Sequence, residues 1–341
     1  MTAEELFTEG CEQTANLRVR QALELYHLAE RAGHDANECA ARRWTCHMLA
    51  GEFELAWRES DTIARRGQPD SNRFWDGRPF TGRRVLLRCL HGLGDTLQFV
   101  RYAPLIRREA RSLTIEAQPK LKALLEQAGI SDGVITWGEA APPWDQQVEV
   151  MELPRIFRTT LASIPTAIPY IDVPVACSPA CSPKKLARQE RQPGPLCVGI
   201  VWAAGLYDPT RSIPIKRLAQ LFDTPGVSFI SLQAGVEGAD VRPWAGQVTI
   251  PPEESTGILE TARTLKKLDL VITVDTMTAH LAGAMGRPVW TLLPYECDWR
   301  WMMERADSPW YPTMRLFRQQ KMDDWNPVIQ SVQRQLSALA K

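Results

Sequence analysis

A glycine turn that ends in an acid is the first peptide of this sequence whose residue types suit chemistry. Gly92-Leu93-Gly94-Asp95 follows a short apolar run and opens an amphipathic helix. Glycines let the backbone approach a ligand closely, and the helix dipole favours an ionised acid at a helix start. The peptide is not the dinucleotide-binding fingerprint, because the third glycine is missing near Gln98. Asp95 is therefore either a side chain of a ligand cleft or only a helix cap.

A second peptide places hydroxyl groups at the opening of a helix. It runs from Asp275, at the end of an apolar strand, through Thr276 and Thr278 into a helix rich in small residues. The N–H groups at the start of such a helix point outward and bind a phosphate or diphosphate without a metal. His280 falls in the first turn of this helix. It is either a structural histidine or a ligand-facing one, and its position beside the anion site favours the second role.

A third peptide joins a predicted strand to a loop of small residues. The strand ends at Trp202, and Arg211-Ser212 follows a few residues later. Arg211 is available for a bidentate contact with a phosphate. The alternative is an exposed loop arginine, and this peptide taken alone favours the alternative.

The residues before about position 68 are predicted to be helical, with turns at Gly33 and Gly51. Residues 44–57 resemble a tetratricopeptide helical hairpin, in which bulky, aromatic and small residues recur at fixed offsets. Two roles remain open for these helices. They dock an acceptor, or they only cap the domain that follows.

Strands alternate with helices in two later blocks, which indicates two parallel α/β halves. Residues 68–82 and 173–195 are rich in proline and polar residues and are predicted to be linkers. Ligands of open α/β sheets lie beyond the carboxyl ends of the strands, so a cleft between the halves is the expected site. The predicted strands are 84–90, 112–117, 133–137, 147–151, 197–202, 227–232, 268–274 and 289–293, and the predicted helices are 95–106, 119–128, 215–222, 257–265, 278–285 and 327–339.

The composition restricts the class of protein. The chain has 341 residues, with 40 Lys and Arg against 40 Asp and Glu, which argues against a general nucleic-acid binder. There is neither an apolar run of membrane-spanning length nor a signal peptide at the start, so we expect a cytoplasmic protein, with peripheral association at the inner membrane left open. The 8 cysteines are scattered without metal-site spacing, so reduced thiols and no metal site are expected.

Together, the three peptides resemble those of bacterial proteins that join tetratricopeptide repeats to a domain like the family 9 glycosyltransferases, the family of the lipopolysaccharide heptosyltransferases. The resemblance implies an α/β fold of the GT-B kind, in which two Rossmann-like domains face a cleft and an α-helical cap precedes them. It also implies an inverting, metal-independent transfer of a sugar from a nucleotide-diphosphate sugar to an acceptor hydroxyl, with no further cofactor. The matching segments are 74–77, 86–87, 92–99, 166–170, the loop at Trp202, 211–214, 231–233, 275–288, 298–301 and 308–312.

The resemblance further implies roles for single residues. Asp95 matches the proposed general base of the family. The family often has a lysine in the loop after Trp202, and Arg211 or Lys216 would replace it here. The acceptor side of the cleft would hold Gly92, Leu93, Gly94 and Gln98. The donor would be bound by Trp202, Arg211, Ser212, Gln233, Asp275, Thr276, Met277, Thr278, Ala279 and His280.

The expected domains are a helical region at 1–70, an acceptor domain at 79–175 and a donor domain at 190–341, whose last helix is free to pack back on the acceptor domain. The expected partners are a nucleotide sugar, an acceptor that is a saccharide, a lipid-linked saccharide or a protein, and a protein partner at the helices, but no nucleic acid. Two other functions stay open: a non-catalytic scaffold with a vestigial nucleotide site, and a nucleotide-sugar epimerase that uses Glu296 and Asp298.

Overall fold

The computed structural model describes residues 1–67, 73–174, 194–205, 208–252 and 257–341. Parts of the predicted linkers at 68–82 and 173–195 lie outside these described residues, as do Cys177 and Cys181. Within the described part of the chain, no helix is both long and apolar enough to cross a membrane.

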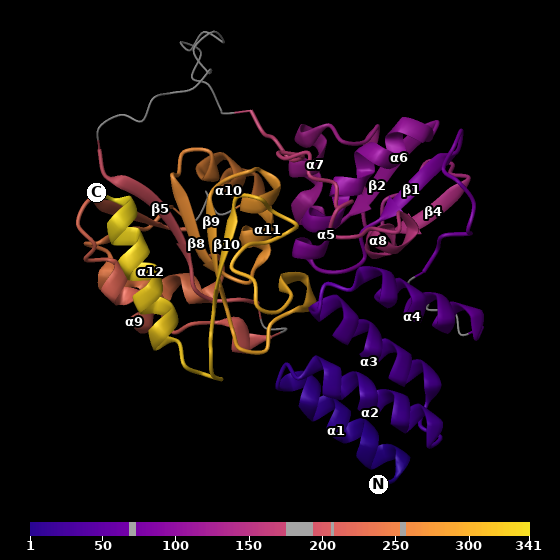
Figure 1. The fold of residues 1–341 in the computed structure, drawn as a ribbon. Coiled ribbons are helices and arrows are strands. Elements are labelled where there is room, and N and C mark those ends of the chain that lie inside the picture. The colour runs from indigo at the N-terminus through magenta and orange to yellow at the C-terminus, as the bar shows by residue number, and fades with distance from the viewer. Residues whose placement is uncertain (68–72, 175–193, 206–207, 253–256) are drawn as a thin grey trace.

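Four helices at the N-terminus stack side by side in chain order, at the indigo end of Figure 1. The side chains of Thr2 and Asp35 cap the first and third helices by accepting backbone N–H bonds. Gly33 and Gly51 have φ of +98° and +74°, so the two predicted turns are confirmed. That these helices are tetratricopeptide repeats stays a prediction. They are α1 (Ala3–Ala15), α2 (Val19–Arg31), α3 (Ala36–Leu49) and α4 (Phe53–Arg65).

A first parallel sheet has four strands in the order β3-β2-β1-β4. Buried apolar residues fill its central strands, as the predicted apolar runs require. The strand predicted at 147–151 ends early, because residues 150–152 form a short 3₁₀ helix. Its elements are β1 (Arg84–Arg88), α5 (Leu93–Phe99), η1 (Val100–Tyr102), α6 (Ala103–Glu109), β2 (Ser112–Ala117), η2 (Pro119–Leu121), α7 (Lys122–Ala128), β3 (Gly133–Thr136), β4 (Gln146–Glu149), η3 (Val150–Glu152) and α8 (Leu153–Ile156).

A second parallel sheet has six strands in the order β10-β9-β8-β5-β6-β7. The prediction of two parallel α/β halves is therefore confirmed. The last helix, α12, packs on α9 and β10 of this second half, whereas we allowed for its return to the first half. The elements are β5 (Leu196–Val201), η5 (Pro209–Arg211), α9 (Ile215–Leu218), η6 (Ala219–Leu221), β6 (Val227–Ser231), η7 (Val236–Trp244), β7 (Val248–Thr249), α10 (Ile258–Leu265), β8 (Leu270–Val274), α11 (Met277–Ala284), β9 (Val289–Leu293), η9 (Trp299–Trp301), β10 (Met314–Arg318) and α12 (Asn326–Leu339).

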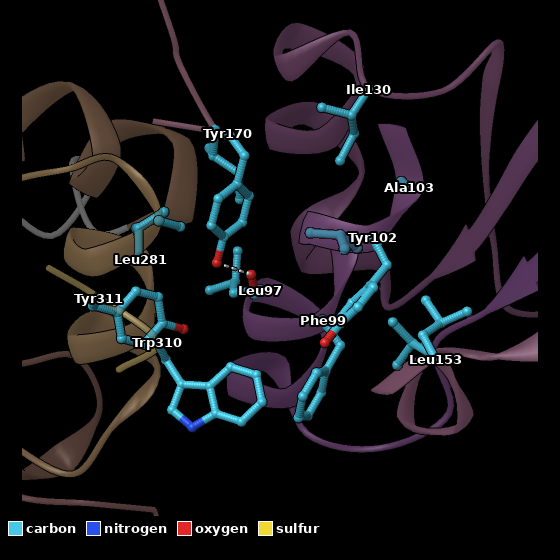
Figure 2. Close-up of a cluster of buried hydrophobic side chains, with 14 of the residues drawn as sticks. Leu97, Phe99, Tyr102, Ala103, Ile130, Leu153, Tyr170, Leu281, Trp310 and Tyr311 are labelled. Carbon is cyan, nitrogen blue, oxygen red and sulfur yellow. Dashed lines mark hydrogen bonds between the residues drawn. The ribbon is translucent and has the colours of Figure 1, made fainter. Parts of the chain in front are cut away.

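One apolar core joins the helical region to both α/β halves. Phe53 of α4 stacks on Trp310 of the second half, with ring centroids 5.8 Å apart. The indole N–H of Trp57 donates to the carbonyl of Thr159, at 2.7 Å. Between the halves, α5 packs directly on α11. Figure 2 shows Leu97 and Phe99 of α5 beside Tyr170, Trp310 and Tyr311 in this core.

Candidate active site

The first two peptides of the sequence analysis meet where α5 packs on α11. Each helix follows the carboxyl end of a parallel strand, β1 for α5 and β8 for α11. Gly94 of α5 lies against the ring of His280, so closely that a Cβ atom on Gly94 would come within 2.8 Å of Cδ2. The absence of a side chain at Gly94 is therefore what allows the two peptides to touch.

Asp95 is the third residue of α5, and the cap that the sequence analysis considered for it is present, while its role in a ligand cleft stays a prediction. Its Oδ2 accepts the N–H of Gly92 at 2.9 Å, which caps the helix. Its Oδ1 accepts from Nη2 of Arg300, which belongs to the second half, at 2.6 Å. The Asp95 side chain keeps 26% of its surface exposed, so a ligand between the halves can still reach its carboxylate.

Arg300 is a buried cation that connects several charged side chains of the site. While Nη2 holds Asp95, Nη1 lies 2.9 Å from both carboxylate oxygens of Asp298. The guanidinium also lies over the ring of Trp299, 4.5 Å from its centroid. Asp298, one of the carboxylates considered for an epimerase, is thus engaged by Arg300.

Asp275 directly follows β8, two residues before the start of α11, and is 5% exposed. Burial raises the pKa of Asp275 to about 6, and the nearby carboxylate of Asp298 adds to the shift. Nη1 of Arg211 donates to the Asp275 carbonyl at 3.2 Å and lies 3.8 Å from Oδ2. Thr276 is the N-cap residue of α11, and its hydroxyl bonds the hydroxyl of Thr273 at 3.0 Å. A cationic side chain therefore stands at the opening of α11, where the phosphate site was predicted.

His280 is buried at the contact between the halves. Its burial, together with the charge of Arg300, lowers the pKa of its imidazole well below the ordinary value, so the ring is neutral at pH 7. Nδ1 bonds the hydroxyl of Tyr311 at 2.9 Å, and Nε2 lies 3.9 Å from Oδ1 of Asp275. The ring also stacks on Trp301. His280 is thus a packed side chain with one ring nitrogen directed toward the predicted donor site.

Apart from Arg211, the described residues of the third peptide shape the backbone of a loop and offer no free side chain. Oε1 of Gln233 accepts the N–H groups of Trp202 and Ala203, at 3.1 and 2.9 Å. The hydroxyl of Ser212 accepts the N–H of Ala204 at 3.0 Å. The Trp202 side chain is only 1% exposed. Gln233 and Ser212 therefore hold the loop after β5 in place, and Trp202 belongs to the core beneath it.

Several other predicted site residues differ in exposure. Gln98 was expected at the cleft, but it is fully buried, because it lies one turn beyond Gly94 on a helix packed against α11. Neither amide atom of Gln98 has a hydrogen-bond partner within the described chain. Ala279 and Thr278 are also buried, whereas Lys216 is exposed. The remaining predicted residues, Gly92, Leu93, Thr276 and Met277, are exposed or half-buried.

The sequence analysis missed the carboxylate of Glu149. It ends β4, next to β1, and accepts the N–H groups of Met151 and Leu90 at 2.5 and 3.4 Å. Burial raises its pKa to about 7, and the charges of Glu152 and Asp95 contribute to the shift. The sequence carried no comparable signal here, because Glu149 lies inside the predicted strand 147–151 and the observed strand, Gln146–Glu149, is mostly polar, whereas Asp275 follows an apolar strand. Among the described residues, no group of His, Cys, Asp and Glu could hold a metal ion.

A segment of the second half matches a known protein family. Residues 248–323 match the model of glycosyltransferase family 9 (heptosyltransferase). This segment contains α11, Asp275 and Arg300, while Asp95 lies outside it.

Over 320 residues, the chain is 25% identical to Protein FlbA of Caulobacter vibrioides (strain ATCC 19089 / CIP 103742 / CB 15), and the match covers 84% of this chain and 53% of FlbA. The chain therefore spans about half the length of this curated relative. The match extends well beyond residues 248–323, so it relates most of the chain to a longer protein.

Solved structures resemble the chain in fold at low sequence identity. The ADP-heptose LPS heptosyltransferase II of E. coli has a TM-score of 0.50 and 13% identity, over 75% of this chain and 98% of that one. The E. coli heptosyltransferase WaaC with ADP-2-deoxy-2-fluoro heptose has a TM-score of 0.49 and 14% identity, over 75% and 99%. The likeness to heptosyltransferase II supports the two-sheet arrangement, and the family match supports the predicted glycosyltransferase.

Proposed function

We propose that this protein is an inverting, metal-independent glycosyltransferase that moves a sugar from a nucleotide-diphosphate sugar to an acceptor hydroxyl. One observation carries the proposal. A partly exposed carboxylate, Asp95, lies on α5, which packs on α11, and it binds Arg300 of the second half. A base on one side and an anion site on the other are what such a transfer requires.

The donor would lie on the second half, with its diphosphate at the start of α11. The unpaired N–H groups of a helix start attract phosphate. Arg211 stands beside this start, and its guanidinium can contact a phosphate through two N–H groups. Both features stabilise the diphosphate as it leaves, since negative charge develops on it when its bond to the sugar breaks.

The acceptor would approach from the first half, where Asp95 serves as general base. Two of the four lone-pair sites of its carboxylate are used by Gly92 and Arg300, which leaves sites for an acceptor hydroxyl. As the acceptor oxygen attacks the anomeric carbon, its proton passes to Asp95 and the diphosphate leaves from the opposite face. Attack from the face opposite the leaving group inverts the anomeric centre.

The proposed reaction requires an acceptor that carries a hydroxyl group. A saccharide, a lipid-linked saccharide and a protein all supply the required hydroxyl. The four N-terminal helices, which we propose to be a tetratricopeptide-like cap, pack on both halves and offer a surface beside the site for a protein acceptor or partner. The proposed location is the cytoplasm, with access to acceptors at the inner membrane.

The variant Asp95→Asn tests this proposal, because it keeps the shape of the side chain and removes the base. We expect a loss of turnover of about 100-fold or more, while donor binding persists in calorimetry. Asp307→Asn is the matched control, since Asp307 forms an exposed ion pair with Arg305. Turnover in Asp95→Asn equal to that of the wild type would exclude Asp95 as the base.

Incubation of the wild type with nucleotide sugars alone separates the remaining functions. Slow release of free nucleotide indicates a transferase, an isomerised nucleotide sugar indicates an epimerase, and no binding at all indicates a scaffold.

A further inference from the structure

Arg101 is a buried cation that no carboxylate of the described chain neutralises. It is 2% exposed and lies in η1, directly after α5. Its N–H groups donate to the carbonyls of Gln98 and Trp310, both at 2.7 Å, and to the hydroxyl of Tyr170 at 3.0 Å. Burial of a charge without an opposite charge costs free energy, so we expect a role of Arg101 beyond packing.

Three aromatic rings surround the guanidinium of Arg101. The ring centroids of Tyr311, Tyr170 and Trp310 lie 4.8, 4.9 and 5.4 Å from it. Figure 2 shows these three side chains gathered beside Leu97 of α5, between the two halves. Trp310 and Tyr311 belong to the second half, so the cation–π contacts of this aromatic cage tie the first half to the second.

Tyr311 carries the connection onward to the donor peptide. Its hydroxyl bonds Nδ1 of His280 at 2.9 Å. Its ring packs so tightly on Gly283 of α11 that a Cβ atom there would come within 2.5 Å. With Nδ1 engaged, Nε2 is the nitrogen of His280 that faces Asp275, at 3.9 Å. A continuous series of contacts thus leads from Arg101 through Tyr311 and His280 to the start of α11.

We propose that Arg101 is a positioning residue, which acts through Tyr311 to fix the ring of His280 with Nε2 facing the donor site. Only the assignment of that site to the donor rests on the proposed function. The linkage itself is a property of the fold, because it joins the two halves whether or not a sugar is transferred. If the cage only stabilised the fold, the tautomer and orientation of the His280 ring would not depend on the Tyr311 hydroxyl.

The test follows the His280 ring by ¹⁵N NMR of the histidine-labelled chain of 341 residues. The chain has 5 histidines, and loss of one set of signals in His280→Gln assigns this residue. In the wild type we expect a neutral ring with one dominant tautomer. Tyr311→Phe removes only the hydroxyl, so we expect loss of the dominant tautomer and a fall in kcat of about tenfold, with little change in donor KM.

Tyr102→Phe is the matched control. Tyr102 is equally buried in the same core, but its hydroxyl bonds Thr159, at 2.7 Å, rather than His280. We expect the control to lose stability without any change at His280. Unchanged His280 signals in Tyr311→Phe, or an equal change in Tyr102→Phe, would overturn the proposal.

Arg101→Lys tests the first link, because lysine keeps the charge but lacks the planar group that bonds three segments at once. It should alter the His280 signals in the same direction as Tyr311→Phe. A folded Arg101→Lys protein with wild-type His280 signals would overturn the role of Arg101. If His280 responds as expected but no sugar is transferred by the wild type, the linkage is supported and the proposed function fails.

Discussion

Asp95 has to serve two partners in the proposed mechanism, the acceptor hydroxyl and Arg300. The guanidinium already binds Oδ1 at 2.6 Å, and it also binds Asp298. Aspartate is a weak base for an alcohol, so proton transfer has to be late and concerted with attack on the sugar. In that arrangement Arg300 fixes the direction of the carboxylate before the acceptor arrives, which is a requirement of catalysis by orientation.

A double-mutant cycle measures this pairing. We expect Asp95→Asn, Arg300→Gln and the double variant to show a coupling of roughly 1–3 kcal/mol in the free energy of unfolding, because Arg300 is largely buried. The exposed pair Arg305–Asp307 is the control, with an expected coupling below about 1 kcal/mol. Equal coupling energies in denaturant titrations of the two cycles would show that the site pair is no stronger than a surface pair.

Glu149 predicts a pH dependence of stability. Its folded pKa is raised by burial to about 7 from an ordinary 4.5. Between these two pKa values, the folded state binds more protons than the unfolded state. Protonation of Glu149 therefore stabilises the folded state at low pH, and this stabilisation is lost as the pH rises from about 4.5 through 7. Over this range the free energy of unfolding falls by roughly 3 kcal/mol, since a pKa difference of one unit corresponds to about 1.4 kcal/mol.

Glu149→Gln should flatten this dependence, because the amide does not titrate. The measurement is the free energy of unfolding in denaturant at pH 5 and pH 8 for both proteins. Other groups titrate in this range, including Asp275, so the wild type and the variant are compared by the difference between their slopes. A variant whose stability falls with pH as steeply as that of the wild type would contradict the assigned burial effect.

At the scale of elements, the contact of α5 with α11 depends on the small size of Gly94. A methyl group there would meet the ring of His280 at 2.8 Å, and Tyr311 and Trp301 hold that ring in place. We expect Gly94→Ala to cost about 1–3 kcal/mol of stability and to weaken donor binding in a thermal-shift titration. Gly246→Ala is the control, since its Cβ would meet nothing within 4 Å.

The sequence predicted best those elements whose signal is local. The strand-turn-helix units of β1 with α5 and β8 with α11 combine an apolar run with a glycine or threonine turn, and β1, β8 and α11 were predicted near their observed bounds. The single helix predicted at 95–106 is instead divided into α5, η1 and α6. β7 has only two residues, and β10 alternates the exposed Arg315 with buried neighbours at the sheet edge. Neither carries the continuous apolar run by which central strands are recognised.

The candidate site was predictable only as separate peptides. The pairing of Asp95 with Arg300 joins residues 205 positions apart, and local spacing carries no information about it. The burial of Gln98 likewise depends on α11, a helix from the other half. By contrast, the position of Asp275 at the end of β8 follows from its own strand, so its place in the site could be predicted.

At the scale of the whole molecule, the N-terminal helices form part of the main core. Met48, Phe53 and Trp57 lie in the same buried cluster as α5 and Trp310. Trp44 of α3 packs on Trp299, the neighbour of Arg300, with ring centroids 5.3 Å apart. The helical region therefore supports the segment that holds Arg300, which is consistent with a cap and does not conflict with docking of an acceptor.

Trp57→Ala tests whether the helical region and the α/β halves unfold together. Trp57 is 5% exposed and donates to Thr159 across the boundary, so truncation should cost about 3–5 kcal/mol. Because the core is shared, we expect one transition, shifted to lower temperature, with coincident curves by circular dichroism and tryptophan fluorescence. Trp144→Ala is the control, since that side chain is 45% exposed and its loss should leave the transition nearly unchanged. Two separate transitions, with only the first moved by Trp57→Ala, would instead mean that the helices are an independent unit whose packing does not support the site.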